Sequence, residues 1–325
     1  MALPRSNHLA DVFGVHSFGA TLIIILVPWL AGGAELFSVT TLTLGLFAIP
    51  LHVFTFGRAF SLQNRTRDQQ APRAGDTVDK VTRIGLFSTA IVGIVIAYLY
   101  SSEPILPLIS LVTYLAAVHL YGDLGKSRVL IFIPPAVAFA SLAAFGYLLT
   151  STLISLTFFL ILAYIFLNTW FQMITSEMVN MDQEGETRFE FMGTKIVAGI
   201  FEPSTTLYSY LWGVKVLALL AIWVMYFSEL ATYGLTVTNL FVTIPSTILT
   251  VVGLYHVKLL SERGPWLKDR ARRYAVIDGI ASILLLPVIL LPIVPLLDIV
   301  VLISIIILSF LLIRRIGWKI WPPII

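Results

Sequence analysis

The sequence of 325 residues contains no cysteine and carries few charges. Without cysteine the chain cannot form a disulfide, a thiolate nucleophile or a zinc–thiolate site. Only 12% of its residues are charged, about half the share found in soluble domains. In contrast, 58% are hydrophobic and the mean hydropathy is +0.92. This balance excludes an ordinary soluble protein and indicates a membrane protein.

Several short catalytic motifs are also absent. The sequence has no GxSxG, no HExxH and no glycine-rich phosphate loop, which removes the signatures of α/β-hydrolases, zinc metalloproteases and P-loop enzymes. His52, His119 and His256 show no metal-ligand spacing. We therefore expect each imidazole to be a satisfied group in the interior or at the membrane interface.

The most prominent feature of the sequence is a series of long apolar runs. A membrane-spanning helix needs roughly 20 mostly apolar residues. The chain holds ten such runs, at about 16–32, 39–60, 82–100, 104–121, 129–149, 152–176, 206–227, 234–257, 273–293 and 296–313. The last two are separated only by "LPIVPLLD", so nine spans are also compatible with the pattern.

These runs predict an all-α fold, a polytopic membrane bundle of nine or ten transmembrane helices. We expect one integral membrane domain over residues 1–325. Within it we expect two pseudo-equivalent halves, at about 1–128 and 129–270, followed by extra C-terminal helices.

The basic residues are confined to alternate connections between the runs. Twenty of the 21 Lys and Arg residues lie in the termini or after the second, fourth, sixth and eighth runs. Loops rich in Lys and Arg stay on the cytoplasmic side. We therefore expect a multi-pass protein of the cell (inner) membrane with both termini in the cytoplasm. Because this distribution serves topology, we expect no nucleic-acid partner.

Lys215 is the exception, since it lies inside the seventh run, roughly 13 Å along a helix that starts at residue 206. An ammonium within the bilayer is expensive and marks a functional site by default. A lysine can also extend its methylenes through the apolar layer and place its charge at the interface. We expect this second arrangement, toward the cytoplasmic interface, and keep the first as the alternative.

Two polar clusters follow the second and sixth runs, "FSLQNRTRDQQAPRAGDTVDK" at 60–80 and "SEMVNMDQEGETR" at 176–188. Four spans separate them, so both lie on the cytoplasmic side. If the helices continue, helical spacing gives each cluster a polar face. These faces are Ser61, Asn64 and Asp68 in the first, and Asn168, Gln172, Thr175, Asp182 and Glu186 in the second. Because unpaired polar groups are costly in lipid, we expect both faces to point into the bundle.

A stripe of side-chain oxygens that ends in acids suits a Mg²⁺-bridged diphosphate. Mg²⁺ takes oxygen ligands and commonly binds through one or two carboxylates together with substrate phosphates. Cationic side chains can hold the remaining phosphate oxygens, and Arg73, Lys126 and Arg128 are expected on the same side of the membrane.

At the second cluster the sequence resembles the UbiA superfamily of intramembrane prenyltransferases. "DQEGETRFEFMGTK" is similar to that family's second motif, an Asp followed by Glu-Gly-Asp and later by Gly and Thr. The matching positions are Asp182, Glu184, Gly185, Glu186, Gly193 and Thr194. The first motif matches less well, and both of its possible registers include Asn64 and Asp68. "HLYGDLGKSR" resembles the segment after the fourth span, where a Tyr and a basic residue face the diphosphate.

The resemblance implies Mg²⁺-dependent transfer of a polyprenyl group from its diphosphate to a lipophilic acceptor at the cytoplasmic face. It implies that Asp68, Asp182 and Glu186 are the catalytic metal ligands, with Asn64 assisting at the metal. The residues expected to bind substrate are Asn64, Arg73, Tyr121, Lys126, Arg128, Asn168 and Gln172. The partners implied are the prenyl diphosphate donor, the acceptor and the lipid bilayer.

Two other functions remain open at this point. A related enzyme of the same fold would cyclise or hydrolyse a prenyl diphosphate without an acceptor, and the sequence does not separate it from a transferase. A transporter or a non-catalytic lipid-binding protein is the third possibility. Transporters often place charges near the middle of the membrane, whereas here the acids gather toward one leaflet and we expect Lys215 to be the only charge in mid-span.

Overall fold

The computed structural model describes most of the chain. It covers residues 16–36, 38–67, 72–123, 133–184, 195–197, 200–202, 204–233, 237–261, 268–291 and 294–304.

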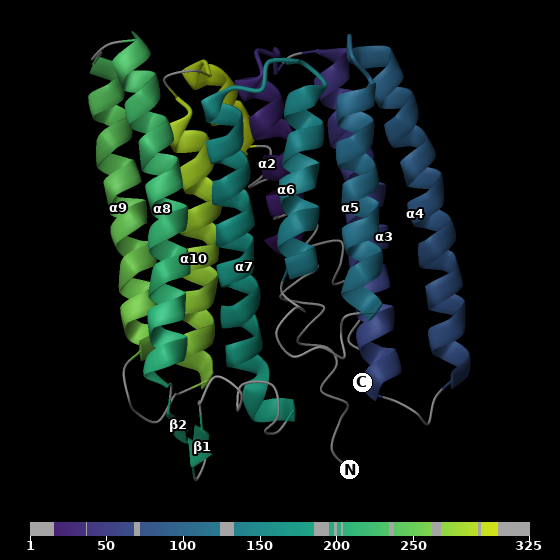
Figure 1. The fold of residues 1–325 in the computed structure, drawn as a ribbon, viewed down its shortest axis with the longest axis vertical. Coiled ribbons are helices and arrows are strands. Elements are labelled where there is room, and N and C mark those ends of the chain that lie inside the picture. The colour runs from purple at the N-terminus through teal and green to yellow at the C-terminus, as the bar shows by residue number, and fades with distance from the viewer. Residues whose placement is uncertain are drawn as a thin grey trace. The chain divides into compact units, whose positions relative to one another are not determined.

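Helices dominate the described residues (Figure 1). They are α2 (His16–Ala31), α3 (Val39–Arg67), α4 (Pro72–Tyr100), α5 (Ile105–Asp123), α6 (Ile133–Leu148), α7 (Leu156–Glu184), α8 (Thr205–Tyr233), α9 (Val237–Ser261) and α10 (Lys268–Ile289). A further helical stretch covers 296–304. Each coincides with one of the predicted apolar runs, so the helical fold is confirmed.

One small departure from the predicted helical fold lies between α7 and α8. The strands β1 (Lys195–Val197) and β2 (Ile200–Glu202) form an antiparallel pair in which Lys195 lies opposite Glu202. From its sequence we expect this segment to be only a polar connection. Its β-branched and aromatic residues favour a strand over a helix, which explains the short hairpin.

The described helices have the length and surface of a membrane protein. Four are long and apolar enough to cross a bilayer, within Lys80–Tyr100, Leu156–Thr175, Thr205–Thr232 and Val242–Leu259. On α4, the exposed side chains include Ile84, Phe87, Ile91 and Val95, which follow one another at helical spacing along one face. A continuous apolar face of this kind is unfavourable in water and suits lipid. The protein is therefore a helical membrane protein, and the count of nine or ten spans stays a prediction.

The helix starts follow local sequence signals. Ser38, Ser155 and Ser204 each precede a helix, and their hydroxyls accept a hydrogen bond from the backbone N–H three residues later, at 3.1, 3.2 and 3.1 Å. These caps satisfy N–H groups that the first helical turn leaves without partners. Pro72 is the first residue of α4, where its missing N–H costs little.

The chain divides into two compact units. Unit 1 comprises Met1–Gly125, Ser141–Leu153 and Val294–Ile325, and unit 2 comprises Lys126–Ala140 and Ile154–Ile293.

The described interior of unit 1 is apolar and joined by neutral polar contacts. The hydroxyl of Thr21 lies 3.0 Å from Nδ1 of His52, which links α2 to α3. The indole N–H of Trp29 donates to Oγ1 of Thr41 at 3.1 Å. Between α2 and α3, Gly33 has a φ of 98°, a backbone conformation that glycine adopts without strain.

Unit 2 is built around α7, α8, α9 and α10. Helix α7 packs against α8, α8 against α9, and α9 against α10, while α10 also contacts α7. These four helices, coloured from teal to yellow in Figure 1, thus enclose a shared interior.

Candidate functional site

A buried ion pair lies in the interior of unit 2. The ammonium of Lys215 on α8 is 2.7 Å from Oδ1 of Asp278 on α10. Only 1% of Lys215 and none of Asp278 is accessible to solvent. Each charge offsets the other, which lets both remain ionised away from water.

The remaining hydrogen-bonding capacity of Lys215 is also used. Its ammonium donates to Oγ of Ser282 at 2.9 Å and approaches Oδ1 of Asn168 at 3.4 Å. It also lies 4.8 Å from the centre of the Phe171 ring, within the range of a cation–π attraction. Oxygens and a ring from α7 and α10 therefore surround a cation that comes from α8.

The second oxygen of Asp278 has two neighbours. Nε2 of Gln172 donates to Oδ2 at 2.7 Å. Nδ1 of His256, on α9, lies 3.2 Å from the same atom. Among the described residues, neither nitrogen of the imidazole has an aligned hydrogen-bond partner. Asp278 thus joins side chains from α7, α8 and α9.

Gly253 on α9 makes room for the pair. A Cβ at this position would lie 2.9 Å from Cε of Lys215 and 3.1 Å from Oδ1 of Asp278. Both separations are tighter than ordinary carbon contacts. A glycine here lets the backbone of α9 close over the ion pair without displacing it.

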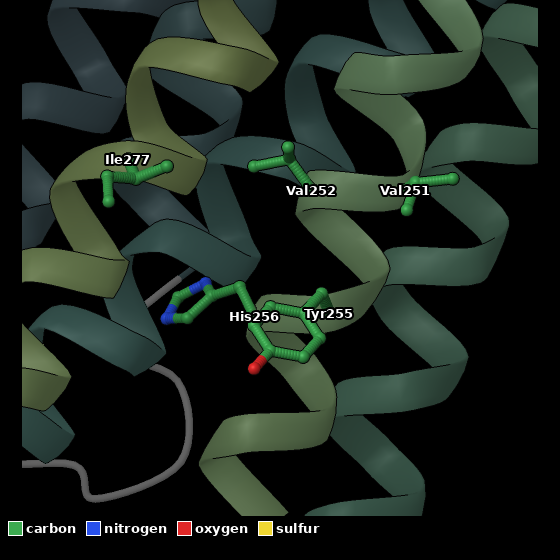
Figure 2. Close-up of a pocket in the computed structure, with 5 residues that line it drawn as sticks. All are labelled: Val251, Val252, Tyr255, His256 and Ile277. Atoms are coloured by element: carbon green, nitrogen blue, oxygen red, sulfur yellow. The ribbon is translucent and has the colours of Figure 1, made fainter.

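An apolar cavity of about 240 Å³ adjoins the cluster on the side of α9 and α10. Val251, Val252, Tyr255, His256 and Ile277 line it (Figure 2). Figure 2 shows the imidazole of His256 reaching from α9 toward α10. The rim is exposed, since Val251, Tyr255 and Ile277 are 58%, 50% and 48% accessible. The cavity is therefore open at the outer surface of unit 2 and has one buried imidazole in its wall.

Some residues of the predicted site lie in this cluster. Asn168 and Gln172 contact Lys215 and Asp278 respectively, and Thr175 is fully buried. We expected the polar face of α7 to point into the interior, and this is confirmed for Asn168, Gln172 and Thr175. We call these three residues the α7 stripe. Their role in binding substrate stays a prediction.

The other predicted site residues lie at or beyond the ends of the described helices. Helix α3 includes Asn64, α4 includes Arg73, α5 includes Tyr121 and α7 includes Asp182, and their side chains lie outside the described part of the structure. The residues that fall outside it entirely are Asp68, Lys126, Arg128 and Glu186. The helix over 156–184 does extend through Asp182, as the pattern required.

Two expectations about charge were wrong. Lys215 does not extend to the interface, because its ammonium is buried and bound by Asp278. Lys215 is also not the only charge within a span. Asp278 lies in the run over 273–293, and an acid inside an apolar run was the signal that could have revealed it.

The histidines differ from one another. His52 is buried and lies within hydrogen-bond distance of Thr21, as expected of a satisfied interior imidazole. His256 is equally buried, and its Nδ1 lies 3.2 Å from Oδ2 of Asp278, while Nε2 has no hydrogen-bond partner among the described residues. The expectation of an interior imidazole is thus confirmed for His256, with one of its nitrogens in contact with a partner.

The described cluster does not suit a divalent metal ion. No group of three His, Asp or Glu side chains with metal-binding geometry occurs among the described residues. Moreover, the ammonium of Lys215 already neutralises Asp278 and would repel a second cation. The predicted Mg²⁺ ligands lie elsewhere, at and beyond the ends of α3 (Asn64 and Asp68) and α7 (Asp182 and Glu186), and their role stays a prediction.

Comparison with known proteins gives no further assignment. No protein-family model, no curated protein and no solved structure matches this chain.

Proposed function

We propose that the protein is an intramembrane prenyltransferase similar to the UbiA superfamily. It would transfer a polyprenyl group from its diphosphate to a lipophilic acceptor at the cytoplasmic face. Helix α7 carries the proposal, because it continues without interruption from Leu156 to Glu184. One helix thus joins a polar interior stripe to the motif that begins at Asp182.

The ion pair gives this stripe a fixed orientation. The amide of Gln172 is bound to Asp278 and that of Asn168 approaches Lys215. Both amides are therefore held by charges that come from other helices. In our proposal Lys215 and Asp278 position the stripe, while Asn168 and Gln172 contact the substrate.

Mg²⁺ would bind at the cytoplasmic end of this stripe through Asp68, Asp182 and Glu186, with Asn64 assisting. When bound, it offsets the negative charge that develops on the departing diphosphate. Arg73, Lys126 and Arg128 would hold the other phosphate oxygens, and Tyr121 would face the same group. The apolar helices exclude water from the reacting carbon.

The proposal is tested with purified protein in lipid nanodiscs, Mg²⁺, radiolabelled geranylgeranyl diphosphate and a lipid extract as the acceptor pool. We expect a labelled, Mg²⁺-dependent lipid conjugate, and a loss of at least a hundredfold in its rate with Asp182→Ala. Glu103→Ala removes an exposed acid between α4 and α5 and should leave the rate unchanged. An unconjugated terpene or alcohol would instead identify a cyclase or hydrolase.

The ion pair favours a second candidate function, proton-coupled transport. Ionisable groups inside membrane helices often mark proton pathways, and unit 2 contains two of them in contact. In proteoliposomes loaded with a pH-sensitive dye, an external acid pulse would then acidify the lumen faster than in protein-free vesicles. Asp278→Asn would abolish the difference. Equal rates with and without protein would exclude this candidate.

A further inference from the structure

Basic residues gather at the end of unit 2 where α9 ends and α10 begins. Four of the first six residues of α10 are basic and one is acidic. The basic ones are Lys268, Arg270, Arg272 and Arg273. Because α9 packs against α10 and only residues 262–267 join them, the last turn of α9, with Lys258, lies at the same end (Figure 1). Neither proposed function uses these residues.

The basic start of α10 matches the depth of a lipid headgroup layer. The helix begins at Lys268, ahead of the apolar run. Residues 274–291 are mostly apolar, and a helix of roughly this length crosses the hydrocarbon core. From Lys268 to Arg273 the helix rises about 7.5 Å, and each headgroup layer is about 5–8 Å thick. The four basic residues thus fall at the level of the lipid phosphates.

Two of the arginines share the face of α10 that meets lipid. Ile277 and Ile280 are exposed on this face. Arg270, Arg273, Ile277 and Ile280 follow one another at intervals of three, four and three residues, which is the spacing of one helix face. Positions 270 and 273 therefore continue the lipid-facing side of α10 toward the headgroups.

The apolar cavity between α9 and α10 starts one helical turn from Arg273, at Ile277 (Figure 2). It exposes almost no polar surface and has a volume of about 240 Å³, whereas a cavity of about 150 Å³ holds benzene. Such a space suits part of an apolar chain and offers nothing to a polar group. Any polar part of the occupant must lie outside it, toward the basic residues.

The exposed side of α9 extends the cavity into an apolar track. Its residues are Ile244, Ile248, Val251 and Tyr255, with Lys258 at the end. They follow one another at intervals of four, three, four and three residues, again one helix face. The track is about 20 Å long, which exceeds the roughly 15 Å of hydrocarbon in one leaflet. It can therefore hold a lipid acyl chain along its length.

We propose that the cavity and this track hold an acyl chain of an anionic phospholipid from the expected cytoplasmic leaflet, and that Arg270 and Arg273 bind its phosphate. Guanidinium groups suit phosphate because they donate paired hydrogen bonds to its oxygens, and Lys258 adds positive charge at the same end. The ammonium of a zwitterionic headgroup is repelled by these charges, so the site selects anionic lipids. The site needs only unit 2 and does not depend on prenyl transfer.

The absence of cysteine allows a test with single labelled positions. Ile248→Cys and Leu217→Cys place a bimane fluorophore on the exposed sides of α9 and α8. Each protein is reconstituted in phosphatidylcholine with a minor fraction of phosphatidylglycerol, and in matched samples only one of the two lipids carries bromine, at equal total bromine. We expect brominated phosphatidylglycerol to quench the label at position 248 about twofold more than brominated phosphatidylcholine. At position 217 the two should quench equally. Equal quenching at 248, or the same excess at both positions, would overturn the proposal.

Charge removal provides the second arm. Arg270→Gln combined with Arg273→Gln should abolish the excess quenching at position 248. Lys80→Gln combined with Arg83→Gln removes two exposed charges from α4 and should leave the excess unchanged. An excess that survives the arginine double variant would contradict the proposal. Geranylgeranyl diphosphate should not relieve the quenching, and relief would show that the site belongs to the prenyl donor instead. Because quenching reports binding, an inactive transferase would not affect this result.

Discussion

The described interiors of the two units use polar side chains in different ways. In unit 1 the buried polar side chains are hydroxyls and one imidazole, at Thr21, Thr41, His52, Thr82, Thr89, Ser110 and Ser141. In unit 2 they include a full positive and a full negative charge, at Lys215 and Asp278. Both units form compact helical structures. Unit 1 therefore shows that such a bundle can be built without buried charge among its described residues.

The difference points to a functional reason for the charges in unit 2. Replacing a buried ion pair with apolar side chains of similar volume is often neutral or stabilising, whereas removing one partner alone is strongly destabilising. We therefore propose that the pair serves a function beyond folding. In our account it holds the α7 stripe in position.

Breaking the ion pair between Lys215 and Asp278 should lower the free energy of unfolding more than any other change considered. Asp278→Ala leaves the ammonium of Lys215 buried without a counter-ion, so we expect the unfolding free energy to fall by about 3–5 kcal/mol. Unfolding in bicelles, followed by steric trapping, measures this change. Lys215→Met combined with Asp278→Leu should restore most of the loss. A change below about 1 kcal/mol in Asp278→Ala would mean that Lys215 finds another partner.

Removing a neighbour of the charge should have a smaller effect. Ser282→Ala deletes the hydroxyl that accepts a hydrogen bond from Lys215 at 2.9 Å. Hydrogen bonds to charged groups contribute about 1.5–3 kcal/mol, so we expect a loss in that range by the same measurement. In the background of the Lys215→Met and Asp278→Leu double variant, Ser282→Ala should have little effect. An equal loss in both backgrounds would show that the hydroxyl does not act through the charge.

Crowding the pair tests whether Gly253 accommodates it. In Gly253→Ala the new methyl would lie 2.9 Å from Cε of Lys215. The lysine cannot move away without lengthening its contact with Asp278, so we expect a loss of about 1–3 kcal/mol. Gly213→Ala on α8 is the matched control, since its added methyl would have no neighbouring atom within 4 Å. That change should be neutral or slightly stabilising, because alanine favours a helix.

The smallest effect is expected in unit 1. Thr21→Val removes the hydroxyl next to His52 and keeps the shape of the side chain. A neutral hydrogen bond contributes about 1 kcal/mol, so this loss should be smaller than that of Ser282→Ala. If Thr21→Val destabilises the protein more than Ser282→Ala does, then the polar contacts of unit 2 are not stronger than those of unit 1, and the contrast between the two units is wrong.

The sequence predicted the helices well because their signals are local. Apolar runs and helix-start residues place each described helix, and helical spacing placed Asn168, Gln172 and Thr175 on the interior face. The polar ends were harder to place. Helix α4 begins at Pro72, ten residues before its apolar run, because "PRAGDTVDK" extends the helix beyond the apolar part.

The ion pair could not be predicted in the same way, because it depends on contacts between distant parts of the chain. Lys215 and Asp278 are 63 residues apart, and nothing in the periodicity of either helix pairs them. The orientation of Lys215 also depends on the space that Gly253 leaves on a third helix. On an isolated helix, the side chain of Lys215 would be expected to extend to the membrane interface. In this bundle Asp278 binds its ammonium in the interior instead.

The central claim is that the pair serves the reaction through the α7 stripe. The most direct measurement compares the Lys215→Met and Asp278→Leu double variant with the native protein, for unfolding free energy and prenyl-transfer rate in one preparation. We predict stability within about 1 kcal/mol of the native value and a transfer rate at least tenfold lower. A double variant that is equally stable and fully active would contradict the account.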